Sequence, residues 1–297
     1  MRLKLTKQND INAPMKVVLL GSDTELGRAI RNYYDNDFDF DWLETPCDDV
    51  ISIVSSSVLD SFYCDAIIDA YSLRSVTQDE YTEYLQLLEG VVARKACPPL
   101  YMLSGVQVFL GDKEASYLET DETDGRSRHA KRLIQAENIV LSSDSNIVLR
   151  TGWLFSGTQD DFVSNTINLV KKGAKIEFHD TAIGCPTPVT DVARVLLSVV
   201  KQRHYGALNT GIYHYCCSEE VSWMGLVEAV LTTSSQFDAR AQNALENIGD
   251  TASALEMAVD VKRQSLSCRK IFNHFGIKQR SWRPVLRGLI KEMYQRA

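Results

Sequence analysis

The chain has no stretch of apolar residues long enough to cross a membrane. A spanning helix needs about 18 or more predominantly apolar residues in a row, and no segment of the 297-residue sequence reaches that length. The first residues, MRLKLTKQNDINAP, also lack the apolar centre of a secretory leader. We therefore expect a cytoplasmic protein with no membrane partner.

The sequence also lacks an excess of positive charge. It has 32 Lys and Arg against 39 Asp and Glu, which gives a formal net charge of -7 at pH 7. Nucleic-acid-binding surfaces are usually basic and often carry aromatic residues between the basic ones, and the sequence has no such patch. We expect no nucleic-acid partner.

The cysteines lack the spacing of a zinc site or of a disulfide framework. There are seven of them, an odd number, and none belongs to a Cys-x-x-Cys pair. We interpret them as reduced thiols and predict no metal site. Two are adjacent in the apolar run GIYHYCCS, where small buried side chains are the simplest interpretation. The seven are Cys47, Cys64, Cys97, Cys185, Cys216, Cys217 and Cys268.

A buried strand, a glycine turn and a helix start are indicated by residues 15–30, MKVVLLGSDTELGRAI. This is the order of the first βα unit of a dinucleotide-binding fold, in which turn glycines let the backbone approach a pyrophosphate at the helix amino terminus. Gly21, Leu26 and Gly27 carry the pattern. The composition, 44% hydrophobic and 24% charged, is that of an ordinary globular protein.

Further motifs follow in the order of a known family. Ser104, Val108 and Phe109 follow an apolar strand, YLETD occupies residues 117–121, and Glu137 lies in the next helix. Later come RTGWLF at 150–155, GCPT at 184–187 and GIYH at 211–214. Together these motifs resemble the RmlD-like branch of the extended short-chain dehydrogenase/reductases, which is typified by dTDP-4-dehydrorhamnose reductase.

The resemblance implies an α/β fold, a Rossmann-like doubly wound parallel sheet with a small C-terminal α/β substrate lobe. We expect an N-terminal tail at 1–14 and a dinucleotide-binding domain at 15–155. Strands near 176–178 and 211–216 should add to its sheet. Residues 156–297 should form mostly the smaller lobe.

The catalytic positions of the family are all changed. In these reductases a Tyr handles the proton at the carbonyl oxygen while the nicotinamide moves a hydride, a Lys lowers the pKa of that Tyr, and a Thr orients the carbonyl. Counting without a gap from YLETD to Glu137 places His129 at the Tyr position and Leu133 at the Lys position. The Thr position is Gly105. No member of the catalytic set is intact.

His129 leaves two interpretations open. An imidazole titrates near neutral pH, so His129 could replace the lost Tyr as a general acid. It also lies in the basic run RSRHAKR at the start of a predicted helix, where a surface histidine needs no catalytic role.

The nucleotide-binding positions are changed as well. The family's loop is Gly-x-x-Gly-x-Leu-Gly, and Thr24 stands at its middle glycine with Asp23 and Glu25 beside it. Tyr71 replaces a small residue that lies beneath the cofactor in the family, so we expect its ring to fill part of the cofactor cleft, and Asp69 replaces an Asn. We therefore predict no cofactor, or weak NADP(H) binding. The remaining cofactor-site residues would be Gly21, Thr24, Glu25, Leu26, Gly27 and Ser104.

Other expected ligand positions are less well defined. Asp39, Asp41 or Glu44 falls near the spacing of a ribose-binding carboxylate. In the substrate lobe the resemblance points to Trp153, to Asp161 in place of an Asn, and to Arg263 as the nearest substitute for an arginine that helps to hold the diphosphate.

Two functional hypotheses follow. In the first, the chain is a non-catalytic RmlD-like protein, a pseudo-reductase, that binds a small nucleotide, a metabolite or a protein partner and acts as a binding or regulatory protein. In the second, it is a divergent NAD(P)H-dependent sugar-nucleotide reductase in which His129 or an unrecognised Tyr replaces the lost acid. The positions that build strands, turns and helix starts are kept, and they support the fold. The positions that would contact cofactor or substrate are changed, and they decide the function. The first hypothesis is favoured.

Overall fold

The computed structural model describes residues 13–33, 39–55, 64–74, 77–94, 97–158, 161–174, 177–178, 182–250 and 262–295. Of the tail expected at 1–14, residues 1–12 lie outside this described part. Residues 13 and 14 precede the first strand.

A six-stranded sheet in the order β10-β5-β4-β3-β1-β2 forms the centre of the molecule, and all of its neighbouring strands pair in parallel. Its inner strands are short and largely apolar, and all of their residues except Lys16 are buried, as parallel strands covered on both faces require. The expected Rossmann-like fold is confirmed. The strands are β1 (Met15–Leu20), β2 (Phe40–Thr45), β3 (Ala66–Asp69), β4 (Leu100–Gly105), β5 (Ile147–Thr151) and β10 (Gly211–Tyr215).

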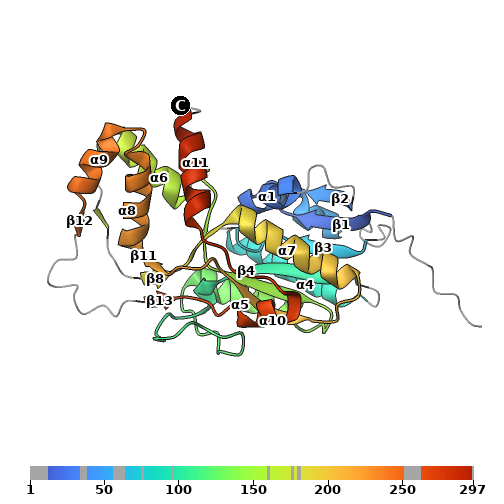
Figure 1. The fold of residues 1–297 in the computed structure, drawn as a ribbon. Coiled ribbons are helices and arrows are strands. Elements are labelled where there is room, and N and C mark those ends of the chain that lie inside the picture. Colours follow the sequence, from blue (N-terminus) through green and yellow to red (C-terminus); the bar gives the residue numbers. More distant parts are fainter. Residues whose placement is uncertain are drawn as a thin grey trace, which may run out of the picture.

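Helices cover both faces of this sheet (Figure 1). On one face α1 (Glu25–Tyr33) packs against α7 (Val189–His204), and on the other α4 (Gln78–Val92) packs against α5 (Arg128–Val140). α4 begins with a capping box between Thr77 and Glu80. α5 begins at Ser127, whose hydroxyl accepts a hydrogen bond from the Ala130 N–H at 3.0 Å. Both helices are therefore held at a fixed start.

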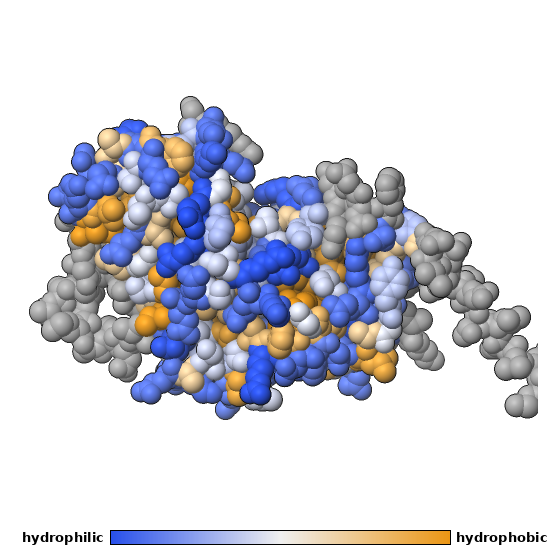
Figure 2. Space-filling view, in the orientation of Figure 1, coloured by the Kyte–Doolittle hydropathy of each residue, from blue (hydrophilic) through white to orange (hydrophobic). Residues whose placement is uncertain are grey.

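A second region stands beside the carboxyl edge of the sheet, on the left in Figure 1. Its helices pack on one another, and a three-stranded sheet in the order β11-β8-β13 underlies them. Figure 2 shows a notch between this lobe and the sheet region at the top of the view. The lobe contains α6 (Phe162–Lys171), α8 (Trp223–Ser234), α9 (Ala239–Glu246), α11 (Arg283–Gln295), β8 (Ala182–Gly184), β11 (Val221–Ser222) and β13 (Lys262–Gln264).

One expected strand lies elsewhere. The strand near 176–178 is β7 (Glu177–Phe178), and it pairs with β12 (Gly249–Asp250) in a separate two-stranded sheet instead of joining the main one. That prediction is wrong because α6, which precedes β7, packs against α8 and α9 and keeps this part of the chain in the lobe. The strand expected near 211–216 is β10, at the edge of the main sheet.

Short elements complete the connections. β6 (Trp153–Phe155) pairs with β9 (Pro186–Pro188) where the chain passes from the sheet to the lobe. α2 (Val50–Ser55) follows β2 after a single 3₁₀ turn, η1 (Cys47–Asp49), and a second such turn, η2 (Val106–Val108), follows β4. α10 (Arg269–Phe275) packs against β10, so the chain returns to the sheet late in the sequence.

A buried ion pair joins α5 to the sheet. Glu137 accepts two hydrogen bonds from Arg150, at 2.6 Å from Nη2 and 3.0 Å from Nε, and each side chain is only 3% exposed. His214 of β10 lies beside Arg150 and places its Nδ1 3.2 Å from the Tyr117 carbonyl oxygen. Burial and the neighbouring Arg150 lower the pKa of His214 to about 3, so this histidine is neutral. We call Glu137, Arg150 and His214 the framework cluster.

Candidate functional site

The glycine turn after β1 has the geometry that a nucleotide-binding loop requires. Gly21 has a φ of +73°, and a β-carbon there would come within 2.9 Å of the Tyr71 backbone nitrogen. A β-carbon at Gly27 would come within 2.1 Å of the Gly21 carbonyl oxygen. Both positions therefore need glycine, the first for its conformation and the second for close packing of α1 on the turn.

Thr24 occupies the middle of this turn and closes it with its own side chain. Its hydroxyl donates to the Gly21 carbonyl oxygen at 2.8 Å and accepts the Gly27 N–H at 2.9 Å. This is the work of a helix N-cap, and it uses one of the free N–H groups that would otherwise face a bound phosphate. Thr24 thus leaves one fewer free N–H group at the start of α1 for an anion.

A cavity of about 400 Å³ remains beside this turn. Its volume is within the range of small-molecule sites, and two guanidinium groups, of Arg28 and Arg74, offer partners for phosphate. It is lined by Asp23, Thr24, Glu25, Leu26, Arg28, Cys47, Ala70, Leu73, Arg74, Leu154 and Val189. The residues present therefore fit part of a dinucleotide. The sequence motifs gave no reason to single out Arg28, Arg74 or Cys47. The presence of Arg28 close to the glycine turn in the sequence was the one signal that could have indicated a phosphate-binding cation.

Two carboxylates oppose an anion in this cavity. Asp23 accepts the Cys47 N–H at 2.7 Å. Burial acts to raise the pKa of Asp23, but hydrogen bonds from Cys47 outweigh it and lower the pKa, so Asp23 stays ionised. Glu25, at the first turn of α1, accepts a hydrogen bond of 2.7 Å from the Ser156 hydroxyl of the segment that leads into the lobe. Both predicted acidic neighbours of Thr24 therefore face the cavity.

Tyr71 does not fill the cavity as expected. Its side chain is buried against Tyr84 of α4, with 5.2 Å between the ring centres, and the Arg74 guanidinium lies over it at 5.8 Å. Arg74, not Tyr71, forms the cavity wall. The backbone at Tyr71 instead supports the Gly21 turn.

Asp69, at the carboxyl end of β3, is fully buried below this cavity. Its carboxylate accepts hydrogen bonds from the Tyr84 hydroxyl at 2.5 Å and from the backbone N–H groups of Tyr71 and Ser72 at 3.0 and 3.1 Å. Burial raises its pKa to about 6 although these hydrogen bonds act to lower it. Near neutral pH the chain therefore holds a buried negative charge where the family resemblance implies a neutral Asn.

The position expected for the catalytic Thr lies beside the exposed side chain of Gln107. A β-carbon built on Gly105 would lie 2.0 Å from Oε1 of Gln107, so this flexible side chain would have to move to admit a larger residue. Ser104, one residue earlier, is fully buried, and its hydroxyl has no hydrogen-bond partner among the described residues. Gln107 was not identified by its motif, and only the structure reveals its role.

His129 and Leu133 lie on one face of α5, four residues apart. Leu133 is 2% exposed and belongs to the hydrophobic core. His129 is half-buried in the first turn, and burial together with Arg132 lowers its pKa below the usual value. The structure brings the three expected positions to the ends of β4 and α5, but it supplies an apolar side chain where the lysine would be.

The three lobe residues have structural partners. The Trp153 ring stacks on Trp223 at 4.0 Å between centres, and its N–H donates to Gln264 at 2.8 Å. Asp161 is the N-cap of α6 and accepts the Ser164 N–H at 2.9 Å. Arg263 pairs with Glu220 at 2.7 Å. Each predicted ligand-binding side chain is therefore already engaged within the protein.

The carboxylates expected near the ribose are not at the cavity wall. Glu44 pairs with Arg31 of α1 at 2.5 Å, and Asp39 pairs with Lys201 of α7 at 2.8 Å. Asp41 is the second residue of β2, between Phe40 and Trp42, and it is exposed, far from the carboxyl end of the strand. The residue that reaches the cavity from this side is Cys47.

Comparison with known proteins decides the family. The sequence profile of the RmlD substrate binding domain matches residues 15–295. The chain belongs to the RmlD substrate binding domain family. A dTDP-4-dehydrorhamnose reductase of Aggregatibacter actinomycetemcomitans is 28% identical over 92% of this chain and 98% of its own length. A reductase of the same name from Sinorhizobium fredii is 25% identical over 93% of this chain and 97% of its own.

Solved structures of RmlD-type proteins have the same fold. A dTDP-4-dehydrorhamnose reductase from Clostridium acetobutylicum superposes with a TM-score of 0.78 at 20% identity, covering 94% of this chain and 99% of that one. One from Bacillus anthracis, in complex with NADP, has a TM-score of 0.75 at 19% identity and the same coverage. In the described residues of the RmlD-like chain no helix is long and apolar enough to span a membrane. The same residues include no cluster of three or more His, Cys, Asp or Glu side chains arranged to hold a metal.

Proposed function

We propose that this RmlD-like chain is a pseudo-reductase, which keeps the reductase fold and part of its nucleotide cavity but does not transfer hydride. The observation that carries the proposal is Leu133. Reduction of a ketone needs a hydride at carbon and a proton at oxygen, and the family's Lys-assisted Tyr supplies that proton. A core leucine can neither donate a proton nor lower the pKa of a neighbour.

His129 is a poor substitute for the missing acid. Burial and Arg132 lower its pKa, so the imidazolium form, which would donate the proton, is less populated at neutral pH than in an exposed histidine. The exposed side chain of Gln107 lies beside Gly105, where a hydroxyl would orient the carbonyl. The second hypothesis, a divergent sugar-nucleotide reductase, needs His129 or an unrecognised Tyr to act as the acid.

The proposed role is binding or regulation through a small nucleotide, a metabolite or a protein partner. Arg28 and Arg74 favour a phosphate in the cavity at the glycine turn, whereas Asp23, Glu25 and the internal hydrogen bonds of Thr24 disfavour it. NADP(H) would supply the hydride chemistry in an active relative. We propose that here it binds weakly, at Gly21, Thr24, Glu25, Leu26 and Gly27, with Ser104 further along the cleft.

Two measurements on the purified full chain test this proposal together. Calorimetric titration with NADPH should give weak binding or none, and NADPH oxidation with dTDP-4-dehydrorhamnose should not exceed the rate without protein. The Aggregatibacter actinomycetemcomitans relative, assayed in parallel, is the positive control for the substrate and the assay. Steady turnover that disappears in a folded His129→Ala variant would establish the enzyme hypothesis instead.

A further inference from the structure

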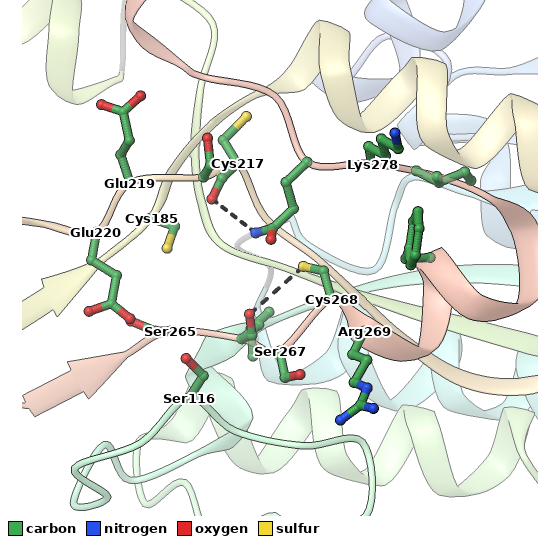
Figure 3. A pocket seen from close by; sticks show the side chains of 15 residues that line it. Ser116, Cys185, Cys217, Glu219, Glu220, Ser265, Ser267, Cys268, Arg269 and Lys278 are labelled. Carbon is green, nitrogen blue, oxygen red and sulfur yellow. Dashed lines mark hydrogen bonds between the residues drawn. The ribbon is translucent and has the colours of Figure 1, made fainter.

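A second cavity, of about 780 Å³, lies away from the glycine turn and shares no lining residue with the cavity there. Three chain segments form most of its wall: 217–220 after β10, 265–269 between β13 and α10, and 277–279 after α10. Cys185, Ser116 and Phe272 complete it. Figure 3 shows Glu219 and Glu220 at one end, and Arg269 and Lys278 at the other. We call it the α10 cavity.

The floor of the α10 cavity is uncharged. Cys185, Cys217 and Cys268 line it, and the Sγ atom of Cys216 lies behind, 3.8 Å from that of Cys268. A hydrogen bond with Cys216 and burial raise the pKa of Cys185, and burial raises that of Cys217, so these thiols remain protonated. Soft, neutral groups of this kind tolerate an apolar ligand but do not attract a cation.

Ser265 adds an unmet hydrogen-bonding group to this floor. Its side chain is fully buried and lines the cavity, and the nearest partner of its hydroxyl is the Cys185 thiol, a weak acceptor that does not satisfy it fully. Leaving a buried hydroxyl without a partner costs about 1–3 kcal/mol. A ligand that reaches Ser265 would recover part of that free energy.

The charges at the two ends of the α10 cavity are not equivalent. Glu219 pairs with Arg283 at 2.7 Å, and Glu220 pairs with Arg263 at 2.7 Å, so both carboxylates are compensated. Arg269 and Lys278 are exposed and form no ion pair with any residue in the described part of the chain. The cavity therefore presents two uncompensated positive charges in a protein whose net charge is -7.

An exposed aromatic ring adjoins these cations. Phe272 is 45% exposed although it is a large apolar residue, and it lies three positions after Arg269 on α10, so the two side chains are neighbours on the helix surface. A ring face next to a cation fits a flat ligand that carries an acidic group. The volume is within the range of sites for small metabolites.

We propose that the α10 cavity binds a small phosphorylated aromatic metabolite of about the size of a nucleoside monophosphate. Its phosphate pairs with Arg269 and Lys278, its ring packs on Phe272, and a polar group reaches Ser265. The site is separate from the cavity at the glycine turn, so it holds whether or not NADP(H) binds there.

Calorimetric titration of the full chain with AMP as the probe tests this site. AMP should bind with a Kd below about 1 mM, and adenosine and inorganic phosphate should each bind at least about tenfold more weakly, because each offers only half of the recognised chemistry. No binding of AMP, or equal binding of adenosine or phosphate, would overturn the proposal.

Charge-reversal variants locate the binding. Arg269→Glu and Lys278→Glu should each weaken AMP binding by about tenfold or more. Lys291→Glu, which makes the same charge change on the exposed face of α11, should change it less than about twofold. Arg74→Glu tests the other cavity: if it abolishes AMP binding while Arg269→Glu does not, AMP binds at the glycine turn and the proposal fails.

Ser265→Ala separates ligand recognition from a structural role. The variant removes a buried hydroxyl whose nearest partner is only the weak Cys185 acceptor, so the free protein should be no less stable by thermal unfolding. Its affinity for AMP should nevertheless fall about threefold or more. A destabilised variant with unchanged affinity would assign Ser265 to the core and remove it from the site.

Discussion

The two ends of α5 differ in how far they keep the residues that the family resemblance implies. Near its carboxyl end, Glu137 keeps a two-hydrogen-bond ion pair with Arg150, and both side chains are almost completely buried. Near its amino end, the same helix presents His129 and Leu133 where the family resemblance implies Tyr and Lys. The helix therefore keeps its buried anchor to the sheet, and our proposal of a pseudo-reductase rests on the two residues that it presents at the other end.

The difference follows from what each substitution would cost. A buried ion pair that loses one partner leaves a charge without compensation, which typically costs 3–5 kcal/mol. A leucine in place of a catalytic lysine costs the fold nothing and adds to the hydrophobic core. Folding thus requires the ion pair of the framework cluster at one end, whereas at the other end it is satisfied by an apolar residue such as Leu133.

The largest expected effect is on the framework cluster. Arg150→Ala should lower the free energy of unfolding by about 3–5 kcal/mol, because Glu137 would remain buried and unpaired. Chemical denaturation measures the change. The matched control is Arg31→Ala, which breaks the exposed pair with Glu44 and should cost less than about 1 kcal/mol. Equal losses in the two variants would show that the framework cluster does not hold the helix.

Asp69 tests whether a buried carboxylate near the glycine-turn cavity lowers the stability of the fold. Its pKa is about 6 in the folded chain and about 4 when unfolded, so between these values the folded state holds a proton that the unfolded state has lost. Stability from this group therefore falls as pH rises from about 4 to 6. Asp69→Asn keeps the acceptor for the Tyr71 and Ser72 N–H groups and removes the charge.

The free energy of unfolding of the Asp69→Asn variant should consequently exceed that of the wild type by an amount that grows with pH. The difference should be about 2 kcal/mol at pH 7 and small near pH 4. Urea unfolding at several pH values provides the comparison. A difference that does not change with pH would mean that Asp69 does not titrate in this range.

The smallest expected effect concerns Thr24. Thr24→Gly frees the Gly27 N–H, so affinity for NADPH should rise by about tenfold, while loss of the cap should cost only a few tenths of a kcal/mol. Thr24→Ser, which retains the hydroxyl, is the control and should show no gain. An unchanged affinity in the glycine variant would place the obstacle elsewhere, at Asp23 or Glu25.

The sequence was most informative where physical constraints are local. Gly21 and Gly27 were identifiable because a turn and a close approach both require glycine, and apolar runs indicated the buried parallel strands. Contacts between distant segments were not accessible in the same way. The hydrogen bond between Glu25 and Ser156, the Gln107 side chain beside Gly105, and the packing of Tyr71 on Tyr84 all depend on tertiary placement.

The α10 cavity illustrates the same limit. Cys185, Cys217 and Cys268 are far apart in the sequence, and burial was predicted only for Cys217, which lies in an apolar run. The structure confirms that burial, and it also brings all three cysteines to the floor of one cavity. The prediction that β7 joins the main sheet failed for a related reason, since a strand of two residues, Glu177–Phe178, does not specify which sheet it joins.

Single-turnover transfer of deuterium tests the loss of catalysis most directly. The protein, in molar excess, is mixed with NADPH deuterated at the transferable position and dTDP-4-dehydrorhamnose, and the sugar product is analysed by mass spectrometry. We predict no deuterium in the product beyond that in a sample without protein, because α5 supplies neither Tyr nor Lys. Deuterium transfer that a folded His129→Ala variant abolishes would contradict this prediction and make His129 the catalytic acid.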